Sequence, residues 1–297
     1  MKDTVLYKYS GAGNDFIVLD GRYDGVSHYR NAAAISSLCD RHSGFAAEDG
    51  RTGADGLMIL STSATCDFRM EFFNPDGSTG MMCGNGGRCI TAFAEGLGIV
   101  PGNGAEYVFE APDGIHRASV VSKDGDKYIV RLRMRQPSVP VRYEQGWFID
   151  TGARHVVRFV DGLESLDVAA EGSAIRHDKA FAPDGVNVDF VSVDVCGGRW
   201  SGGTRPPSAL LGGSEEHLDQ LPPSATLAIR TFEKGVEAET LACGTGIVAA
   251  ALIFNHLYPE STPRIISVHA RKDTLEVEIY QQEVWLTGPA ELICSRL

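Results

Sequence analysis

The chain has 297 residues, of which 43% are hydrophobic and 22% charged, with a formal net charge of −12. This length is sufficient for two domains that each bury their own core. The acidic balance argues against binding to the phosphate backbone of nucleic acids, and no cluster of lysine and arginine interrupts it. Nucleic acid is therefore not an expected partner.

The expected compartment follows from the chain start and the cysteines. The first eight residues contain no apolar signal segment. The longest uncharged apolar stretch, residues 246–254, is too short to cross a bilayer. Seven cysteines with irregular spacing are typical of reduced thiols rather than of a disulfide framework. We expect a cytoplasmic protein without a membrane partner.

Hydrophobic patterning predicts many strands and only three helices. The predicted strands are residues 5–9, 16–20, 57–60, 68–73, 128–134, 186–193, 227–232, 275–280 and 284–286. The predicted helices are residues 32–41, 84–97 and 244–257. Strands outnumber helices without regular βαβ alternation, so the fold class is α+β.

Two of the helices begin directly after a cysteine in matching surroundings. Cys83-Gly84-Asn85-Gly86 resembles Cys243-Gly244-Thr245-Gly246, and a strand with a polar loop precedes each motif. Residues 10–14 are echoed by residues 151–155, which aligns Asn14 with His155. An internal repeat of this length predicts two related domains, each a sheet around one helix.

The proposed boundary lies at the proline-containing segment near residues 135–140. Residues 1–136 would form the first domain with Cys83, and residues 137–285 the second with Cys243. Residues 196–223 are rich in glycine, serine and proline, and we interpret them as a surface insertion without catalytic content.

A cysteine at a helix start is chemically significant because a thiol is a useful base only as a thiolate. Free N–H groups and the positive end of the helix dipole stabilise such an anion. Neighbouring glycines let backbone amides approach an anionic ligand. If the two halves face one another, one thiol removes a proton while the other returns one. The pattern therefore predicts proton transfer at one carbon by Cys83 and Cys243.

Other residues have simpler interpretations when they are taken singly. Cys89 lies on another face of its helix and is expected in the core, and the remaining cysteines lack the spacing of a zinc site. His155 is equally consistent with a structural histidine. Asn74 could serve only to close a turn, and Glu233 with Lys234 could be an exposed strand end. No lysine lies in a context that indicates a Schiff base.

The motifs together resemble the diaminopimelate epimerase family over essentially the whole chain. The motifs that carry the resemblance are Gly11-Ala12-Gly13-Asn14-Asp15-Phe16, Gly53-Ala54-Asp55-Gly56, the segment from Phe73-Asn74-Pro75 to Cys83-Gly84-Asn85-Gly86-Gly87-Arg88-Cys89, Asn187-Val188-Asp189-Phe190, and Glu239-Thr240-Leu241-Ala242-Cys243-Gly244-Thr245-Gly246.

The resemblance implies two similar pseudo-symmetric domains, each a mixed, barrel-like sheet wrapped around a central helix. It implies that the last strand, near residues 286–297, returns to the first domain. It also implies interconversion of LL- and meso-diaminopimelate without cofactor or metal, in lysine and peptidoglycan precursor biosynthesis. The expected partner is a small amino-acid substrate, and a homodimer is an open possibility.

Carried over by position, Cys83 and Cys243 are the two bases. The carboxylate cradle is Gly84, Asn85, Gly244 and Thr245. Side-chain ligands of the substrate are Asn14, Asn74 and Asn187. His155 and Glu233 adjust the thiols and hold the α-ammonium group, beside Lys234.

The chain also departs from the family pattern, which usually has asparagine at Ala153, proline at Arg154 and arginine at Lys234. A lysine cannot form the bidentate fork that arginine makes to a carboxylate. Residues 45–51 are an insertion, and the loop from Glu233 to Cys243 is one residue longer than usual. These changes affect recognition more than proton transfer.

Three alternatives therefore stay open. A racemase of another amino acid, such as histidine or proline, would show altered recognition residues. A thiol redox or metal-storage protein would use the same two cysteines to bind zinc. A catalytically inactive interaction protein would have little reason to retain both thiols.

Overall fold

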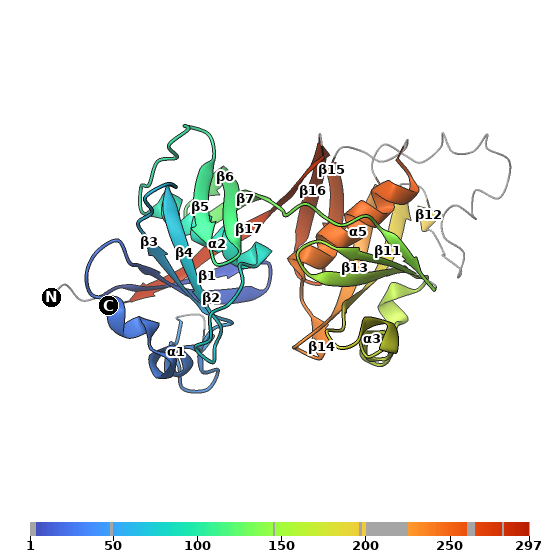
Figure 1. Cartoon of the computed structure of the whole chain (residues 1–297), viewed down its shortest axis with the longest axis horizontal. Helices are drawn as coiled ribbons and strands as arrows, with labels where there is room; N and C mark the ends of the chain where they lie inside the picture. Colours follow the sequence, from blue (N-terminus) through green and yellow to red (C-terminus); the bar gives the residue numbers. More distant parts are fainter. Residues whose placement is uncertain are drawn as a thin grey trace. The chain divides into compact units, whose positions relative to one another are not determined.

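The computed structural model describes residues 4–47, 50–144, 146–195, 198–199, 225–259, 265–280 and 282–296. Two compact units share the chain (Figure 1). The first is Met1–Arg133 with Thr287–Leu297, and the second is Met134–Leu286. The predicted insertion at residues 196–223 lies outside the described residues, apart from the short strand Gly198–Arg199.

The first unit is a closed barrel of eight strands. Each strand pairs with the next along the chain, and the last pairs with both the first and the seventh. The strands are β1 (Leu6–Gly11), β2 (Asn14–Asp20), β3 (Leu57–Ser61), β4 (Phe68–Phe73), β5 (Tyr107–Ala111), β6 (Gly114–Asp124), β7 (Lys127–Arg133) and β17 (Glu283–Arg296).

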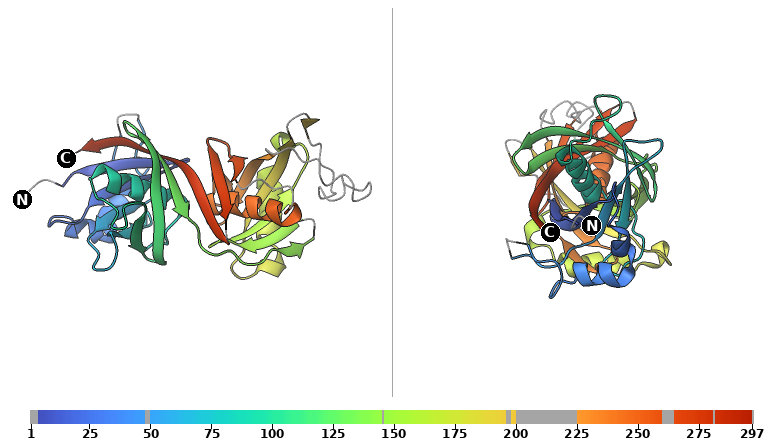
Figure 2. Two further views of the ribbon diagram at one scale, coloured as in Figure 1. Left: turned by 90° about the horizontal axis from the view of Figure 1, so that it is seen from above. Right: turned by 90° about the vertical axis from the view of Figure 1, so that its left-hand side faces the viewer.

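The helix α2 (Gly84–Gly96) fills this barrel, as the end-on view of Figure 2 shows. Residues 84–94 are all buried, and the helix contacts β1, β2, β3, β6 and β7. Five of the first eleven helical residues are glycine or alanine. At Gly87, an added Cβ would lie 2.9 Å from a methyl carbon of Leu132. Small residues thus let the strands close tightly around the helix.

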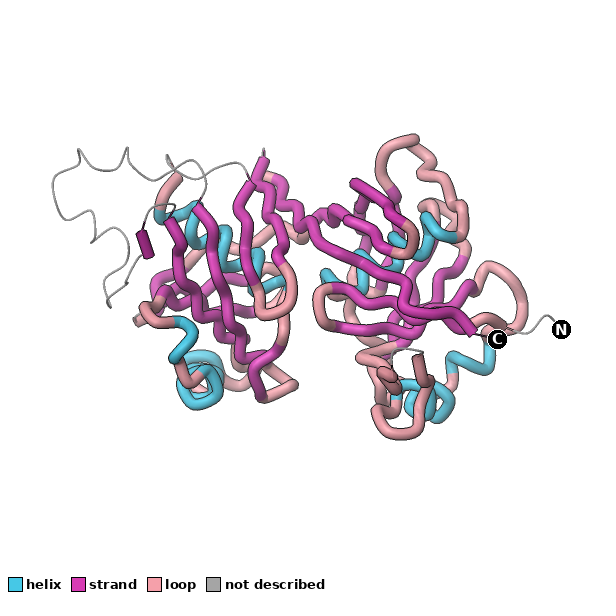
Figure 3. The backbone as a smooth tube through the Cα atoms, turned by 180° about the vertical axis from the view of Figure 1, so that it is seen from behind, coloured by secondary structure: helices cyan, strands magenta, loops and turns pink. Residues whose placement is uncertain are grey.

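The second unit has a sheet in the order β8–β9–β10–β11–β13–β15–β16, with β12 beside β11 and β14 beside β13. It packs around α5 (Gly244–Leu257), of which residues 246–254 are all buried. Figure 3 shows strands on several sides of this helix. The strands are β8 (Val141–Tyr143), β9 (Gly146–Asp150), β10 (Arg154–Phe159), β11 (Asn187–Val195), β12 (Gly198–Arg199), β13 (Ala225–Glu233), β14 (Ala238–Thr240), β15 (Ile265–His269) and β16 (Thr274–Tyr280).

The two units repeat one pattern of pairing. In the first, β1 to β6 pair in the order antiparallel, parallel, antiparallel, parallel, antiparallel. The second has the same order through β9, β10, β11, β13, β15 and β16. A helix occurs at the same two points of each repeat: α1 (Ala32–Cys39) matches α3 (Val168–Arg176), and α2 matches α5. The expected pseudo-symmetric α+β architecture is confirmed.

Strand register corrects the expected alignment of Asn14 with His155. Ile17 pairs with Leu57, which pairs with Phe73, whereas Val156 pairs with Val188, which pairs with Phe232. Matching these two sets places Ala153 at the position of Asn14. It also aligns Gly13 with Gly152, and both glycines have positive φ angles, 109° and 104°. The sequence echo was therefore misaligned by two residues.

All three predicted helices are present, and the two that follow a cysteine begin at the predicted residue. Helix α3 was not predicted because Gly172 interrupts its pattern; a Cβ there would lie 2.4 Å from the Cβ of Phe232. Three short 3-10 helices complete the described elements: Ser27–Arg30, Leu163–Ser165 and Lys179–Phe181. Over the part of the chain described, none of the helices is both long and apolar enough to span a membrane.

Candidate active site

Cys83 caps the N-terminus of α2. Its backbone is extended, with φ −109° and ψ 154°, and its Sγ accepts a hydrogen bond from the Gly86 N–H at 3.2 Å. The backbone oxygen of Cys83 accepts the first helical bond, from the Gly87 N–H. The earlier N–H groups of a first turn have no acceptor within their helix. The sulfur therefore lies where the helix dipole favours negative charge.

Asn14 and Asn85 lie together beside this helix end. The Asn85 side-chain amide donates to Asn14 Oδ1 at 2.6 Å. Their approach depends on Gly11, where an added Cβ would lie 2.9 Å from Cys89 Sγ and 3.0 Å from the Asn85 carbonyl oxygen. Cys89 is fully buried, as expected for a core residue.

Cys243 begins α5 in the same extended conformation, with φ −114° and ψ 111°. Its Sγ lies 3.4 Å from Thr245 Oγ1, which in turn lies 2.9 Å from His155 Nε2. His155 Nδ1 lies 2.7 Å from Asp189 Oδ2. Thr231 Oγ1 donates to the other oxygen of Asp189 at 2.7 Å. A continuous hydrogen-bonded series thus joins a buried carboxylate to the thiol.

The directions of these bonds follow from their chemistry. An ionised carboxylate only accepts, so His155 Nδ1 carries the proton donated to Asp189. In the neutral imidazole, Nε2 then accepts from the Thr245 hydroxyl, whose oxygen is left to accept from the Cys243 thiol. When Cys243 is a thiolate, the same hydroxyl donates to sulfur instead. The orientation of one hydroxyl is thereby linked to the protonation state of Cys243.

The surroundings of Cys243 favour its protonated form. Burial raises the pKa of this thiol well above its ordinary value, and the negative charges of Glu233 and Asp189 raise it further. The Thr245 hydroxyl acts in the opposite direction and lowers the pKa. These surroundings therefore favour the thiol form of Cys243 over the thiolate.

Asn187 connects the same site to the loop after β13. Its side-chain amide lies 3.4 Å from His155 Nε2 and donates to the Arg154 carbonyl oxygen at 3.3 Å. Its Oδ1 accepts from the Lys234 backbone N–H at 2.9 Å. The Lys234 side chain is exposed and Glu233 is partly exposed. Asn187 therefore fixes the point where β13, which ends at Glu233, passes into the loop that begins with Lys234.

Asn74 is held in a turn of its own. Its side chain donates to Ser78 Oγ at 3.0 Å, its N–H bonds the Ser78 carbonyl, and its carbonyl accepts from Gly77. These contacts match the simpler interpretation of Asn74 as a turn residue. They do not join it to Asn14 or Asn85.

The structure thus assembles the predicted residues in two groups. Asn14, Gly84 and Asn85 accompany Cys83 in the first unit. His155, Asn187, Gly244 and Thr245 accompany Cys243 in the second, with Glu233 acting on its pKa. Sequence reasoning missed the roles of Asp189 and Thr231. The sequence offered one signal for Asp189, which lies inside the predicted strand of residues 186–193. A carboxylate buried in a strand needs a hydrogen-bond partner, so a partner for Asp189 could have been expected.

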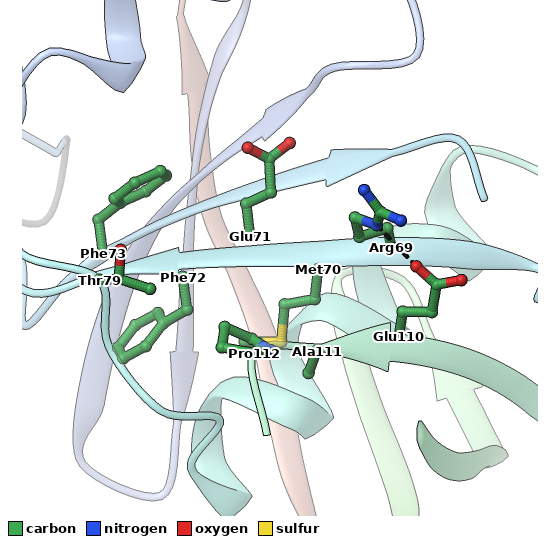
Figure 4. A pocket seen from close by; sticks show the side chains of 9 residues that line it. All are labelled: Arg69, Met70, Glu71, Phe72, Phe73, Thr79, Glu110, Ala111 and Pro112. Carbon is green, nitrogen blue, oxygen red and sulfur yellow. Dashed lines mark hydrogen bonds and ion pairs between the residues drawn. The ribbon is translucent and has the colours of Figure 1, made fainter. Parts of the chain in front are cut away.

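A groove in the first unit lies apart from these groups (Figure 4). It opens along β4 and β5, where Arg69 and Glu110 form an ion pair at 2.7 Å. None of the predicted site residues lines it. Within the described part of the chain, no group of three histidine, cysteine or acidic residues is arranged to hold a metal ion.

Comparison with known proteins decides the family. The chain matches the family model for diaminopimelate epimerase over residues 6–138 and 147–293. A diaminopimelate epimerase from Chlorobaculum tepidum is 40% identical over 295 residues, covering 96% of this chain and 97% of its own. Another from Flavobacterium psychrophilum is 34% identical over 293 residues, covering 97% of both chains.

The chain belongs to the diaminopimelate epimerase family. It is accordingly an epimerase, an enzyme of the isomerase class. Among solved structures, a phenazine biosynthesis protein of the PhzF family from Bacillus anthracis matches with a TM-score of 0.64 at 12% identity, covering 100% of this chain and 99% of its own. This likeness shows a shared fold.

Proposed function

We propose that this epimerase interconverts LL- and meso-diaminopimelate, a step of lysine and peptidoglycan precursor biosynthesis. The family match across both units supports this substrate. The observation that carries the proposed chemistry is the repeat itself: Cys83 and Cys243 each begin the central helix of one unit. A single reactive thiol would not need this duplication.

In the proposed reaction, one sulfur starts as a thiolate and the other as a thiol. The thiolate removes the α-proton, the bond electrons pass into the α-carboxylate as an enediolate, and the opposite thiol protonates the carbon from the other face. The two sulfurs have then exchanged protonation states. The reverse direction uses them in the opposite roles.

The helix ends supply the stabilisation that this intermediate needs. The N–H groups of Gly84 and Asn85, and of Gly244 and Thr245, would bind the α-carboxylate and its enediolate form. Glu233 would pair with the α-ammonium group. Asn14, Asn74, Asn187 and Lys234 would contact the distal amino-acid group. Lys234 would provide a point charge where the family usually has a guanidinium.

The proposal includes catalysis without cofactor or metal, because thiol and thiolate supply both proton transfers. It also includes a cytoplasmic location, where thiols stay reduced, and a small amino acid as the sole ligand. Neither nucleic acid nor membrane has a part in it. A homodimer is compatible with this mechanism but is not required by it.

The test is incubation of the reduced enzyme with LL-diaminopimelate in D₂O. We expect α-deuteration with formation of the meso isomer, unaffected by EDTA or hydroxylamine. Loss of activity on treatment with EDTA or hydroxylamine would contradict the mechanism without metal or cofactor. Deuteration of proline or histidine but not of diaminopimelate would favour a racemase of another amino acid, which the alanine at position 153 keeps as the second candidate.

A further inference from the structure

The side-chain amide of Asn14 is held on both sides. Its Nδ2 donates to Asp55 Oδ2 at 3.0 Å, and its Oδ1 accepts from Asn85 Nδ2 at 2.6 Å. Because a carboxylate only accepts hydrogen bonds, the nitrogen of Asn14 must face Asp55. The orientation of this amide is therefore determined by its partners.

A cation stands at each end of this series. Arg88 Nη2 donates to Asn85 Oδ1 at 2.6 Å, which fixes the second amide because a guanidinium only donates. At the other end, Arg41 Nη2 contacts Asp55 Oδ1. Arg41 also holds Asp15 by two bonds, of 3.1 and 2.8 Å. The complete series runs Arg88, Asn85, Asn14, Asp55, Arg41, and every group in it has one allowed direction.

Counting hydrogens shows what the series offers to a ligand. Each amide nitrogen carries two hydrogens, and one on each asparagine is used within the series. Both amide oxygens are already engaged. Asn14 and Asn85 therefore each retain an N–H, which suits an anionic oxygen such as that of a carboxylate.

The second unit lacks this series although it repeats the fold. The register places Ala153 at the position of Asn14, and the matching helix starts place Thr245 and Val248 at the positions of Asn85 and Arg88. The same strands and central helix thus form without it. The fold therefore does not require this series of hydrogen bonds. Its presence in the first unit indicates that the series has a role in ligand binding.

We propose that Arg41 and Asp55 are positioning residues for substrate recognition: Arg41 fixes the Asp55 carboxylate, and Asp55 turns the N–H of Asn14 toward a carboxylate of the substrate. This inference rests on the proposed function, because it needs Asn14 to contact the substrate. It assigns a purpose to an arginine and an aspartate that touch no substrate themselves.

The first test compares Asp55→Asn, Arg41→Gln and Arg41→Lys with wild type. Asp55→Asn allows the Asn14 amide to rotate, so we expect KM to rise about tenfold while kcat stays within about threefold, since a lost charge-assisted bond weakens binding by roughly this factor. Arg41→Gln should act similarly. Arg41→Lys keeps the positive charge but cannot form two parallel hydrogen bonds to a carboxylate. Its KM should therefore lie between those of wild type and Arg41→Gln.

The matched control is Arg30→Gln. Arg30 holds Glu71 by two bonds of 2.8 and 2.7 Å in the same unit, at comparable exposure, but its partners are Glu71 and Ser61 rather than Asp55, the residue that holds Asn14. It should leave KM unchanged. Equal KM values in Asp55→Asn, Arg41→Gln and Arg30→Gln would overturn the proposal.

A double variant separates positioning from structure. Asn14→Asp with Asp55→Asn re-forms the bond between positions 14 and 55 in the opposite direction. The melting temperature should recover in part, because an asparagine at position 55 can donate to an aspartate at position 14 but its nitrogen cannot accept from the Asp15 N–H as Asp55 Oδ2 does. KM should stay high because position 14 then offers only acceptors. Recovery of the wild-type KM would contradict the proposal. Wild type that fails to epimerise diaminopimelate would instead refute the proposed function.

Discussion

Asp189 Oδ2 lies 2.7 Å from His155 Nδ1, and both side chains are completely buried. The pair is the inner end of the hydrogen-bonded series that reaches Cys243 through Thr245. A buried carboxylate is costly unless its lone pairs are satisfied, and Thr231 provides the second bond. The arrangement selects the tautomer of His155 with its proton on Nδ1, so that Nε2 accepts from the Thr245 hydroxyl.

Replacing Asp189 with asparagine removes the charge and keeps the shape. We expect kcat to fall by about 10- to 100-fold, because a hydrogen bond to a charged group contributes roughly 1.5–3 kcal/mol. The matched control is Asp113→Asn, since His116 Nε2 lies 3.0 Å from Asp113 Oδ1 in a similarly buried pair of the first unit. The control should lower the melting temperature but not kcat. Equal kcat values in the two variants would show that His155 acts only structurally.

Thr245→Val tests the hydroxyl between the thiol and the imidazole. The variant keeps the shape but breaks both bonds of Thr245 Oγ1, so we expect kcat to fall about tenfold. Thr91→Val is the control, because Thr91 is buried in α2 and, among the described residues, its hydroxyl bonds only the Gly87 carbonyl. Steady-state kinetics should separate the two. A fully active Thr245→Val enzyme would exclude the hydroxyl from proton transfer.

Gly246→Ala should disrupt the same site by steric means. A Cβ at this position would lie 2.4 Å from Asp189 Oδ1, so the carboxylate must move. We expect loss of most activity and a lower melting temperature. At Gly96, near the end of α2, the nearest atoms to a Cβ are 3.4 Å away. Gly96→Ala should keep full activity and gain up to about 1 kcal/mol of stability. Normal activity in Gly246→Ala would contradict the observed packing.

The buried thiol of Cys39 predicts instability in alkali. Burial raises the pKa of Cys39 from 9.0 to about 12, so the unfolded chain loses this proton at a lower pH than the folded chain. Its contribution to stability is complete below pH 9 and declines as the pH rises toward 12. At pH 10 the decline amounts to about 1 kcal/mol for one group.

Urea unfolding under reducing conditions at pH 8 and pH 10 measures this decline. In Cys39→Ala, the difference in unfolding free energy between the two pH values should shrink by about 1 kcal/mol. Cys66→Ala is the control, because this thiol is partly exposed. An unchanged difference in Cys39→Ala would show that Cys39 does not cause the alkaline loss.

Sequence patterning was most successful where hydrophobic residues cluster. The helices after Cys83 and Cys243 and the strand β4 begin at the predicted residues. Sequence patterning missed strand β6, because the second half of this strand is largely exposed and it lacks an apolar run. Closure of the first barrel by β17 depends on pairing between distant segments, which local patterns do not encode.

At the candidate site, the sequence indicated the residues whose expected roles rest on their own chemistry. Cysteines at helix starts and asparagines in glycine-rich turns carry a local signal. Asp189 and Asp55 do not, because their roles depend on partners 34 and 41 residues away. The alignment of Asn14 with His155 failed for a similar reason, since only strand register shows which residues correspond.

The most direct test of the account is hydrogen exchange by enzymes that retain one thiol. Cys83→Ala and Cys243→Ala should each lose epimerisation by several orders of magnitude, because one proton carrier is missing. With LL- and meso-diaminopimelate in D₂O, NMR should show that each variant still exchanges the α-hydrogen slowly, and that the two variants prefer opposite configurations at that carbon. Exchange of the same configuration by both variants, or near-normal epimerisation by either, would contradict the two-thiol mechanism.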